Sequence, residues 1–307
     1  MGMNTNTNVD FIIPTREEDN FLDRLDGSYT KVSEMSAAER AFLNALILRN
    51  KPRKLLELGV SAGGSSVVTL NAIKDFSDAQ LYSIDLNEMF YKNDREKTGY
   101  FVDNYPDLKS KWELLTGGLA LNFMDKIGAG VDFCLIDTVH SNPGEILDFL
   151  MILPFLKDDA VVVFHDVTLH VQYFVMKKYA RAEKAITNNM LMSAITGRKL
   201  LQGSHDGDLF ANIGGIRIGK DTKENVFEIF NLLTIPWCYL PTDKQEQEII
   251  SWFERYYDKY YIDYLTRVFA FQKKVITGKT RYKIKAAIKK IVGAKNAGKI
   301  QRLARGG

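Results

Sequence analysis

A glycine-rich segment and a later acid are the residues of this sequence whose types and spacing first indicate chemistry. Gly59, Gly63 and Gly64 follow the apolar run at residues 54–58, and Asp85 follows the next apolar run. Glycines let a backbone turn tightly and approach a ligand closely, and the helix that follows offers free N–H groups. An acid placed like Asp85 can accept hydrogen bonds from a ribose diol. The pattern predicts a nucleoside site; the alternative is a tight turn beside a solvated acid.

The segments that carry these residues alternate between strands and helices. We predict strands at residues 54–58, 81–84, 112–115, 131–136 and 160–164, and helices at residues 65–75, 92–104, 144–156 and 169–179. Such alternation implies parallel strands joined by crossovers, hence a three-layer α/β fold. Continuous apolar strands are typical of a sheet that is covered on both faces.

The remaining segments complete the predicted organisation. Ser36 and Glu39 form a capping box at the start of a helix. Residues 208–218 indicate a hairpin that turns at Gly214 and Gly215. We predict four parts: a loosely structured N-terminal arm (1–35), a cofactor-binding domain (36–220), a helical extension (221–271) and a basic amphipathic tail (272–307).

The order of the motifs resembles that of the class I S-adenosylmethionine-dependent methyltransferases. Glu57-x-Gly59-x-x-x-Gly63-x-Ser65 resembles their first motif, and Asp85 resembles their ribose-binding acid. The segments DFCLIDTVHS (132–141) and FLKDDAVVVFHDV (155–167) resemble their motifs at the fourth and fifth strands. The resemblance extends over about residues 36–220 and is greatest to the catechol methyltransferase-like and cephalosporin hydroxylase-like branch.

This resemblance implies a Rossmann-like three-layer sandwich with a mostly parallel seven-stranded sheet, plus a helical C-terminal extension. It implies S-adenosyl-L-methionine as the cofactor, which is consistent with the lack of a phosphate-binding lysine after the glycines. The implied cofactor-binding residues are Glu57, Gly59, Ser61, Gly63, Ser65, Asp85, Leu86, Gly118 and Asp137.

Acidic and imidazole side chains follow two strands that are neighbours in this fold. Asp137 follows the strand at residues 131–136, and His165 and Asp166 follow the strand at residues 160–164. Neighbouring strands lie about 4.8 Å apart, so these side chains converge. The resemblance implies a metal held by Asp137, His165 and Asp166, Mg²⁺ or, because relatives often carry an acid in place of His165, Mn²⁺. The alternative is that Asp166 caps the next helix and no metal binds.

His140 lies three residues after Asp137 and is a candidate general base, because an imidazole suits proton abstraction near neutral pH. The alternative is a loop histidine bonded to backbone. The predicted catalytic residues are therefore Asp137, His140 and Asp166. The hypothesis is O-methylation of a sugar or small-molecule hydroxyl by in-line displacement, with most of the rate derived from positioning.

Two other functions stay open. Tyr173-x-x-x-Lys177 matches the catalytic pair of the NAD(P)-dependent short-chain oxidoreductases, although the upstream serine of that family has no counterpart here. The chain is alternatively an inactive methyltransferase-fold binding protein.

Charge is distributed unevenly along the 307 residues. Residues 264–307 carry 13 Lys and Arg and no acid, which leaves residues 1–263 with a net charge of −10. An acidic body argues against nucleic acid as a partner. The tail pattern of Ile284, Ile288, Ile291 and Val292 among lysines predicts a basic amphipathic helix for peripheral contact with an anionic membrane.

Location and assembly are expectations from composition. The two cysteines, Cys134 and Cys238, lie in apolar runs, and the N-terminus lacks a secretory pattern. Both observations favour a reducing, cytoplasmic setting, at the inner membrane face if the tail docks there. The aromatic residues at 252–264 favour packing on the body or on a second subunit of a homo-oligomer, with a ring-binding platform for a glycan or small-molecule acceptor as the alternative.

Overall fold

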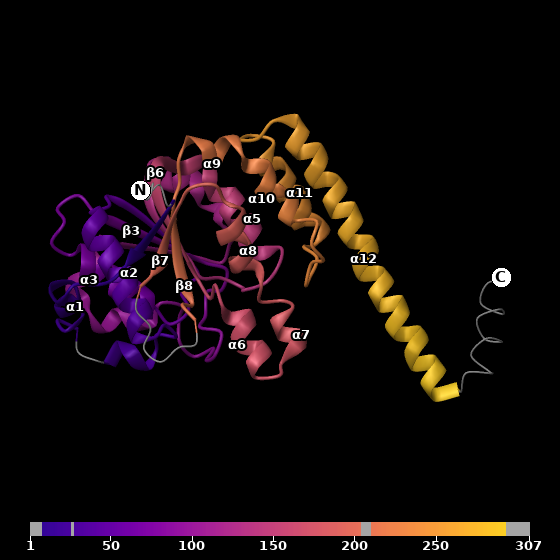
Figure 1. Ribbon diagram of the computed structural model, residues 1–307, viewed down its shortest axis with the longest axis horizontal. Helices are drawn as coiled ribbons and strands as arrows, with labels where there is room; N and C mark the ends of the chain where they lie inside the picture. The colour runs from indigo at the N-terminus through magenta and orange to yellow at the C-terminus, as the bar shows by residue number, and fades with distance from the viewer. Residues whose placement is uncertain (1–7, 26–27, 204–209, 293–307) are drawn as a thin grey trace, which may run out of the picture. The chain divides into compact units, whose positions relative to one another are not determined.

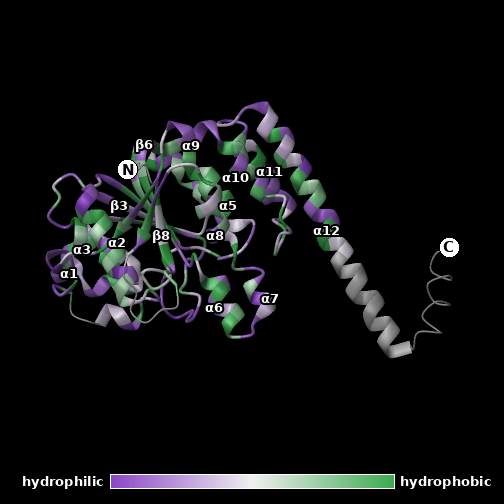
Figure 2. Ribbon diagram, in the orientation of Figure 1, coloured by the Kyte–Doolittle hydropathy of each residue, from purple (hydrophilic) through white to green (hydrophobic). Residues whose placement is uncertain are grey.

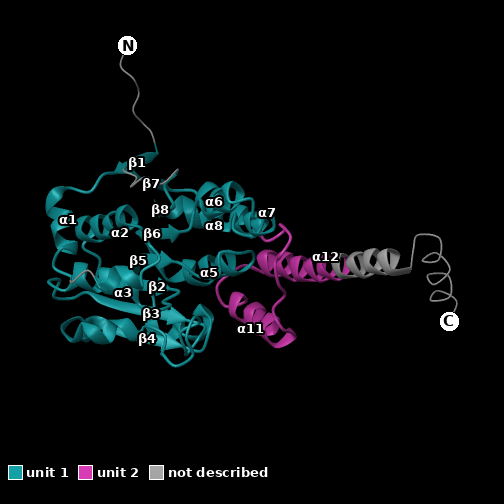
Figure 3. Cartoon of the chain, turned by 90° about the horizontal axis from the view of Figure 1, so that it is seen from below, with its two compact units in different colours: residues 1–232 teal, residues 233–307 magenta. Residues whose placement is uncertain are grey.

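The computed structural model describes residues 8–25, 28–203 and 210–292, with side chains described up to Gly278 in the last helix (Figure 1). The chain divides into two compact units, residues 1–232 and 233–307 (Figure 3). The division lies after α10 (Val226–Leu232), rather than at the predicted position 220, because α9 (Lys220–Glu224) and α10 belong to the first unit.

The first unit is built on one sheet of eight strands in the order β1-β7-β8-β6-β5-β2-β3-β4. β8 is antiparallel to β6 and β7, and the other pairs are parallel. The strands are β1 (Val9–Ile12), β2 (Lys54–Leu58), β3 (Gln80–Asp85), β4 (Trp112–Thr116), β5 (Val131–Ile136), β6 (Leu156–His165), β7 (Arg198–Gln202) and β8 (Ile213–Arg217). The predicted mostly parallel sheet is confirmed, with eight strands instead of seven.

Helices cover both faces of this sheet, as predicted. Figure 3 shows α1 (Arg16–Leu22), α2 (Ala37–Asn50) and α3 (Gly64–Ile73) on one side of the strands, and α5 (Gly144–Ile152) and α8 (Thr187–Ala194) on the other. Shorter helices complete the unit: α4 (Met124–Ile127), α6 (Leu169–Val175) and α7 (Tyr179–Ala182). Because the sheet is covered twice, its central strands contain continuous buried apolar runs, such as Val161, Val162, Val163 and Phe164 in β6.

The eighth strand lies in the segment that was predicted to be a loose arm, and that prediction was wrong. β1 pairs in parallel with β7 at the sheet edge, where Lys199 N donates to Asn8 O at 2.9 Å and Gly203 N donates to Ile12 O at 2.9 Å. Of its apolar side chains, Ile12 is buried but Phe11 is 69% exposed. An edge strand held mainly by backbone hydrogen bonds leaves little hydrophobic pattern in the sequence.

Two other local predictions were also wrong. Gly214 and Gly215 lie inside β8 rather than in a turn, and a Cβ on Gly214 would meet Met192 Cε of α8 at 2.9 Å. Glycine there marks a close approach of helix to strand. The predicted helix at 92–104 is instead a turn-rich segment with a β-bridge between Met89 and Lys97, followed by a short 3₁₀ helix at Tyr100–Asn104.

The second unit contains α11 (Asp243–Phe253) and α12 (Lys259–Val292), so the predicted helical extension at 221–271 is interrupted at residues 254–258. Its core includes Gln272, whose Nε2 donates to the carbonyls of Leu233 and Ile235, each at 2.9 Å. The backbone of α12 reaches Val292, but the side chains of the predicted amphipathic pattern and residues 293–307 lie outside the described part of the chain. Within the described residues, no helix has the length and apolar character needed to span a membrane.

The buried face of α2 gives a test of this core. Phe42 is 0% exposed and packs among the apolar side chains of α2, α3 and β2. We expect Phe42→Ala to lower the free energy of unfolding by about 3–5 kcal/mol, because it removes buried contacts and leaves a cavity. Urea unfolding followed by circular dichroism measures the change. Phe11→Ala, at an exposed edge position, is the matched control, and equal midpoints for the two variants would contradict the packing.

Candidate active site

The residues that the sequence singled out lie at one edge of the sheet. The parallel register pairs Leu58 of β2 with Ile84 of β3 and with Ile136 of β5, and pairs Ile136 with Phe164 of β6. The segments that follow these strands therefore meet. They contribute Gly59 to Gly63, Asp85 and Leu86, Gly117 and Gly118, Asp137 to His140, and His165 and Asp166.

The loop after β2 packs directly against the segment after β5. Gly59 has a φ of +88°, and a Cβ built on it would lie 1.8 Å from the carbonyl oxygen of Asp137. Asp137 N donates to Leu58 O at 2.9 Å, and Gly59 N donates to Ile84 O at 2.9 Å. Only glycine fits this approach, because any other residue would overlap the Asp137 backbone.

Asp85 ties the glycine-rich loop to the end of β3. Its Oδ2 accepts from the backbone N–H groups of Val60 at 2.9 Å and Ser61 at 3.1 Å, and its Oδ1 accepts from Asn87 N at 2.8 Å. A carboxylate has about four acceptor positions, so the backbone already uses most of them. Asp85 remains half-buried, beside the exposed side chain of Leu86.

Glu57 and Ser65 lie beneath the loop rather than on its surface. Glu57 is 1% exposed and accepts hydrogen bonds from the hydroxyls of Ser65, Ser66 and Ser83, each at 2.6 Å. Burial raises the Glu57 pKa to about 7, despite the opposing effect of these hydroxyls. The side chains of Glu57 and Ser65 therefore hold β2, β3 and the start of α3 together, and the cofactor contact that the resemblance implies for them stays a prediction.

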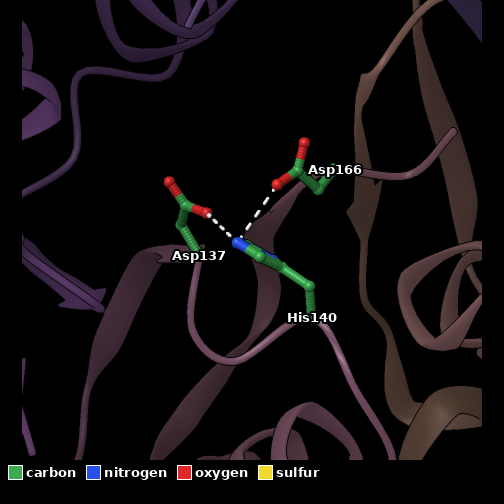
Figure 4. Close-up of side chains that lie close together, drawn as sticks. All are labelled: Asp137, His140 and Asp166. Atoms are coloured by element: carbon green, nitrogen blue, oxygen red, sulfur yellow. Dashed lines mark ion pairs between the residues drawn. The ribbon is translucent and has the colours of Figure 1, made fainter. Parts of the chain in front are cut away.

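Asp137, His140 and Asp166 converge at the ends of β5 and β6 (Figure 4). His140 Nε2 lies 3.1 Å from Asp166 Oδ2 and 3.6 Å from Asp137 Oδ1. One ligand atom from each residue lies within 4.8 Å of the others. This set shares Asp137 and Asp166 with the predicted metal set and contains His140 instead of His165, whose Nδ1 lies 3.7 Å from Asp166 Oδ2.

A buried carboxylate fixes the other side of the His140 ring. Glu145 of α5 is 0% exposed, and its Oε1 lies 3.2 Å from His140 Nδ1. Asn188 of α8 donates to the same Oε1 at 2.8 Å. Burial opposes the imidazolium, but the Glu145 hydrogen bond and the charges of Asp137 and Asp166 outweigh it and raise the His140 pKa to about 9. In the metal-free chain His140 is therefore protonated at neutral pH.

His165 lies behind this cluster and connects it to α2. Its Nδ1 lies 3.2 Å from Asp137 Oδ1, and its Nε2 lies 3.5 Å from Glu39 Oε1. The pKa of His165 is raised, since the nearby carboxylates, Asp137 first, outweigh the effect of burial. Burial would raise the Asp137 pKa, but the charge of His165 lowers it, so an Asp137 carboxylate faces a His165 imidazolium.

Asp166 is oriented by a neighbouring strand and does not cap α6. It has a φ of +57°, and its Oδ1 accepts from Asn212 Nδ2 at 2.7 Å. Asn212 Oδ1 in turn accepts from Thr168 N at 3.0 Å. Thr168 is the residue that precedes α6, with no side-chain cap. The alternative role that the sequence offered for Asp166 is therefore not observed.

Four residues of this site were not singled out as functional from the sequence: Glu39, Glu145, Asn188 and Asn212. Glu39 was identified only as a capping-box residue, a role that the structure confirms. Glu145 lies only five residues after His140, so this closeness in sequence could have identified it as a partner of the histidine. Asn188 and Asn212 are distant in sequence and carry no recognisable motif.

The oxidoreductase pair does not lie on one helical face. Tyr173 is in α6, which ends at Val175, whereas Lys177 follows the helix with a φ of +56°. The helical spacing that made Tyr173-x-x-x-Lys177 suggestive is therefore absent.

The comparison with protein families agrees with the motif order. Residues 56–167 match a family described as a methyltransferase domain, a range that includes every strand end of the site. The comparison with curated proteins gave no match. Similar solved structures include the O-methyltransferase TomG from Streptomyces achromogenes, which is involved in tomaymycin synthesis and is in complex with SAM. The two sequences are 16% identical, the TM-score is 0.46, and the match covers 66% of this chain and 96% of that one. An O-methyltransferase from Bacillus cereus in complex with SAH has 17% identity and a TM-score of 0.45, covering 67% of this chain and 93% of that one.

The buried Glu57 network predicts a pH dependence of stability. The folded chain holds the Glu57 proton up to about pH 7, whereas the unfolded chain releases it near the ordinary value of 4.5. The folded state therefore binds more protons in this window, and its stability falls as the pH rises through it. We expect the loss of unfolding free energy between pH 5 and pH 8 to be about 2–3 kcal/mol smaller in Glu57→Gln than in the wild type, at roughly 1.4 kcal/mol per pKa unit. Urea unfolding at pH 5 and pH 8 measures it.

Glu224→Gln, at an exposed helix position, is the control for this comparison. For each variant, the unfolding free energy at pH 8 is subtracted from that at pH 5, so a destabilisation by the amide that is the same at both pH values cancels. An unchanged difference in the Glu57→Gln variant would contradict the assignment.

Proposed function

We propose that this chain, an enzyme of the class I S-adenosylmethionine-dependent methyltransferases, transfers a methyl group to a hydroxyl oxygen of a sugar or another small molecule. The observation that carries the proposal is the position of the Asp137, His140 and Asp166 cluster. It lies at the edge of the sheet that carries the glycine-rich loop, and the Asp137 backbone is in contact with Gly59. A cofactor on that loop would have its reactive end beside the cluster.

The residues at the ends of β3 and β4 fit the nucleoside half of the cofactor. Asp85 pairs with Thr116 in the sheet register, and Gly117 N donates to Asp85 O at 3.0 Å, so the two turns are adjacent. Leu86 offers an exposed apolar side chain beside the half-buried Asp85 carboxylate. We infer that Asp85 contacts the ribose through Oδ1, in exchange for the long 3.4 Å contact from Asn87 Nδ2, while its backbone contacts keep the carboxylate in one orientation.

The cluster also fits a divalent ion. Its separations of 3.1 and 3.6 Å between ligand atoms are close to those around an ion with ligands at 2.0–2.3 Å. Two carboxylates and one imidazole favour Mn²⁺ over Mg²⁺. A divalent ion there would lower the pKa of a bound hydroxyl. Such an ion must displace the His140 proton, and the surrounding carboxylates that hold this proton attract the ion in the same way.

The residues of the chain supply the rest of the reaction by orientation. Glu145 and Asn188 fix the His140 ring, His165 fixes Asp137, and Asn212 fixes Asp166, so the acceptor meets side chains that are already in place. Methyl transfer to oxygen needs the nucleophile in line with the methyl group, and this positioning can supply several kcal/mol. As the hydroxyl attacks, its proton passes to the carboxylate of Asp137 or Asp166, whichever lies within hydrogen-bond reach.

Removing the Asp137 charge tests the reaction. We expect Asp137→Asn to reduce the formation of S-adenosylhomocysteine by 10²–10⁴-fold across a panel of sugar and aryl hydroxyls, the range typical of a lost acid–base or ion-binding group. Cofactor binding, measured by calorimetry, should weaken yet remain detectable. Asp158→Asn, an exposed carboxyl on β6, is the control. Turnover of the Asp137→Asn variant at the wild-type rate would refute the proposal.

Ion binding is tested without turnover. We expect Mn²⁺, detected by electron paramagnetic resonance, to bind the wild-type chain at one site and His140→Ala at least tenfold more weakly, since one of three protein ligands is lost. Asp158→Asn should bind like the wild type. Equal affinity in wild type and His140→Ala would exclude this cluster as the ion site and leave the Asp137 test of the reaction standing.

The remaining alternative is a methyltransferase-fold protein without catalytic activity. A raised melting temperature with S-adenosylhomocysteine shows an intact cofactor site, because a ligand of the folded state adds stability. Such binding, with no product from any acceptor in the panel, would favour that alternative.

A further inference from the structure

The α6–α7 tip, defined as residues 174–184, exposes large apolar side chains close to the candidate active site. Phe174, Val175 and Met176 are each at least 57% exposed, and Tyr179 is 53% exposed. Figure 2 shows α6 coloured largely as a hydrophobic helix. None of the residues of α6 is buried. A helix of this composition normally buries its apolar face, so the described part of the chain does not provide the surface that covers this one.

Basic side chains surround the apolar ones. Lys177, Lys178, Arg181 and Lys184 are all exposed, against the single acid Glu183. None of the four forms an ion pair with a carboxylate of the described residues. The tip is therefore locally cationic although residues 1–263 are acidic overall.

Aromatic rings in the tip, and that of Tyr173 directly before it, lie beside one another or beside basic side chains. Phe174 and Tyr179 form an edge-to-face pair with centroids 5.3 Å apart. Lys178 Nζ and the Arg181 guanidinium each lie 5.9 Å from the ring of Tyr173. Aromatic rings beside cations on an otherwise apolar helix are typical of segments that lie in the interface of a membrane.

We propose that the α6–α7 tip docks on an anionic membrane surface, with Phe174, Val175 and Met176 inserted at the level of the headgroups. Charge complementarity selects this occupant. A second copy packed tip against tip about a two-fold axis would bring the lysines of the two tips together, which like charges disfavour. Anionic headgroups instead neutralise each exposed lysine or arginine while the apolar side chains leave water.

The tip lies close to the active site along the chain, so docking of the tip would also hold the active site near the membrane. α6 begins three residues after Asp166, and its seven residues span only about 10 Å. A hydroxyl acceptor carried by a lipid would therefore reach the Asp137, His140 and Asp166 cluster while its chain stays in the bilayer. This consequence rests on the proposed function, whereas the docking itself does not.

A positional probe tests the docking on the full chain. We expect the Phe174→Trp variant to show a blue shift and strong quenching by brominated lipids when mixed with vesicles of 70% phosphatidylcholine and 30% phosphatidylserine. The control is Phe11→Trp, at an exposed position of the edge strand β1, and should show neither effect beyond the background of the native tryptophans. Vesicles of phosphatidylcholine alone should give weaker binding, because the anionic attraction is missing.

Substitution of the apolar side chains tests their contribution. The variant Phe174→Ser, Val175→Ser, Met176→Ser should bind the anionic vesicles at least tenfold more weakly in co-sedimentation, while Phe11→Ser should bind like the wild type. All of these side chains are exposed, so both variants should keep the wild-type melting temperature.

Three results would overturn the proposal. Vesicle binding without quenching in Phe174→Trp would show that the basic segment at 264–307 docks while the tip stays in water. Absence of vesicle binding would exclude a membrane. A wild-type dimer that becomes monomeric in the triple serine variant, measured by sedimentation, would assign the tip to a second copy of the chain. Loss of methyl transfer with normal vesicle binding would contradict the proposed function and leave the docking proposal unaffected.

Discussion

Two imidazoles lie among four carboxylates at the edge of the sheet, and the arrangement of the active-site edge depends on keeping these charges paired. Transferring such groups from water costs several kcal/mol per ion unless opposite charges and hydrogen bonds compensate. The compensation comes from four carboxylates: Glu39 of α2, Asp137 directly after β5, Glu145 of α5 and Asp166 directly after β6. Each element is thereby fixed relative to the others at the point where a reaction would occur.

Two neutral amide side chains orient the charged groups of this cluster. Asn188 donates both to Glu145 and to the backbone oxygen of His165, the latter at 2.6 Å. Asn212 connects Asp166 to Thr168. Because α8 and the residue before β8 supply these amides, the segment between Asp166 and β8 orients the site although it carries none of its charged groups. The same segment includes α6 and α7, so the chain that supports the cluster from behind also exposes the apolar tip beside it.

The parallel strands and the glycine-rich loop provide the other constraint. Gly59 allows two strand ends to meet at backbone distance, and the buried Glu57 network holds the loop from below. Acids that look alike in the sequence therefore differ in role: Glu57 is enclosed by hydroxyls, Asp85 is bound to backbone N–H groups, and Asp137 is paired with imidazoles. The surroundings of each acid, rather than its residue type, decide whether it is available to a ligand.

The sequence by itself determined the parallel α/β fold, the strands that carry the site and most of the residues at their ends. These features follow from local signals: apolar runs, glycines that require unusual backbone angles, and acids placed directly after strands. Only the tertiary structure decided that both histidines contact Asp137 and Asp166, with His140 partly exposed and His165 buried, because burial depends on segments that are distant in sequence. It also decided the roles of Glu39, Asn188 and Asn212, the strand at residues 9–12 and the exposure of α6. Each of these depends on which distant segments pack together, and side-chain pairing across such distances leaves no periodic trace in the sequence.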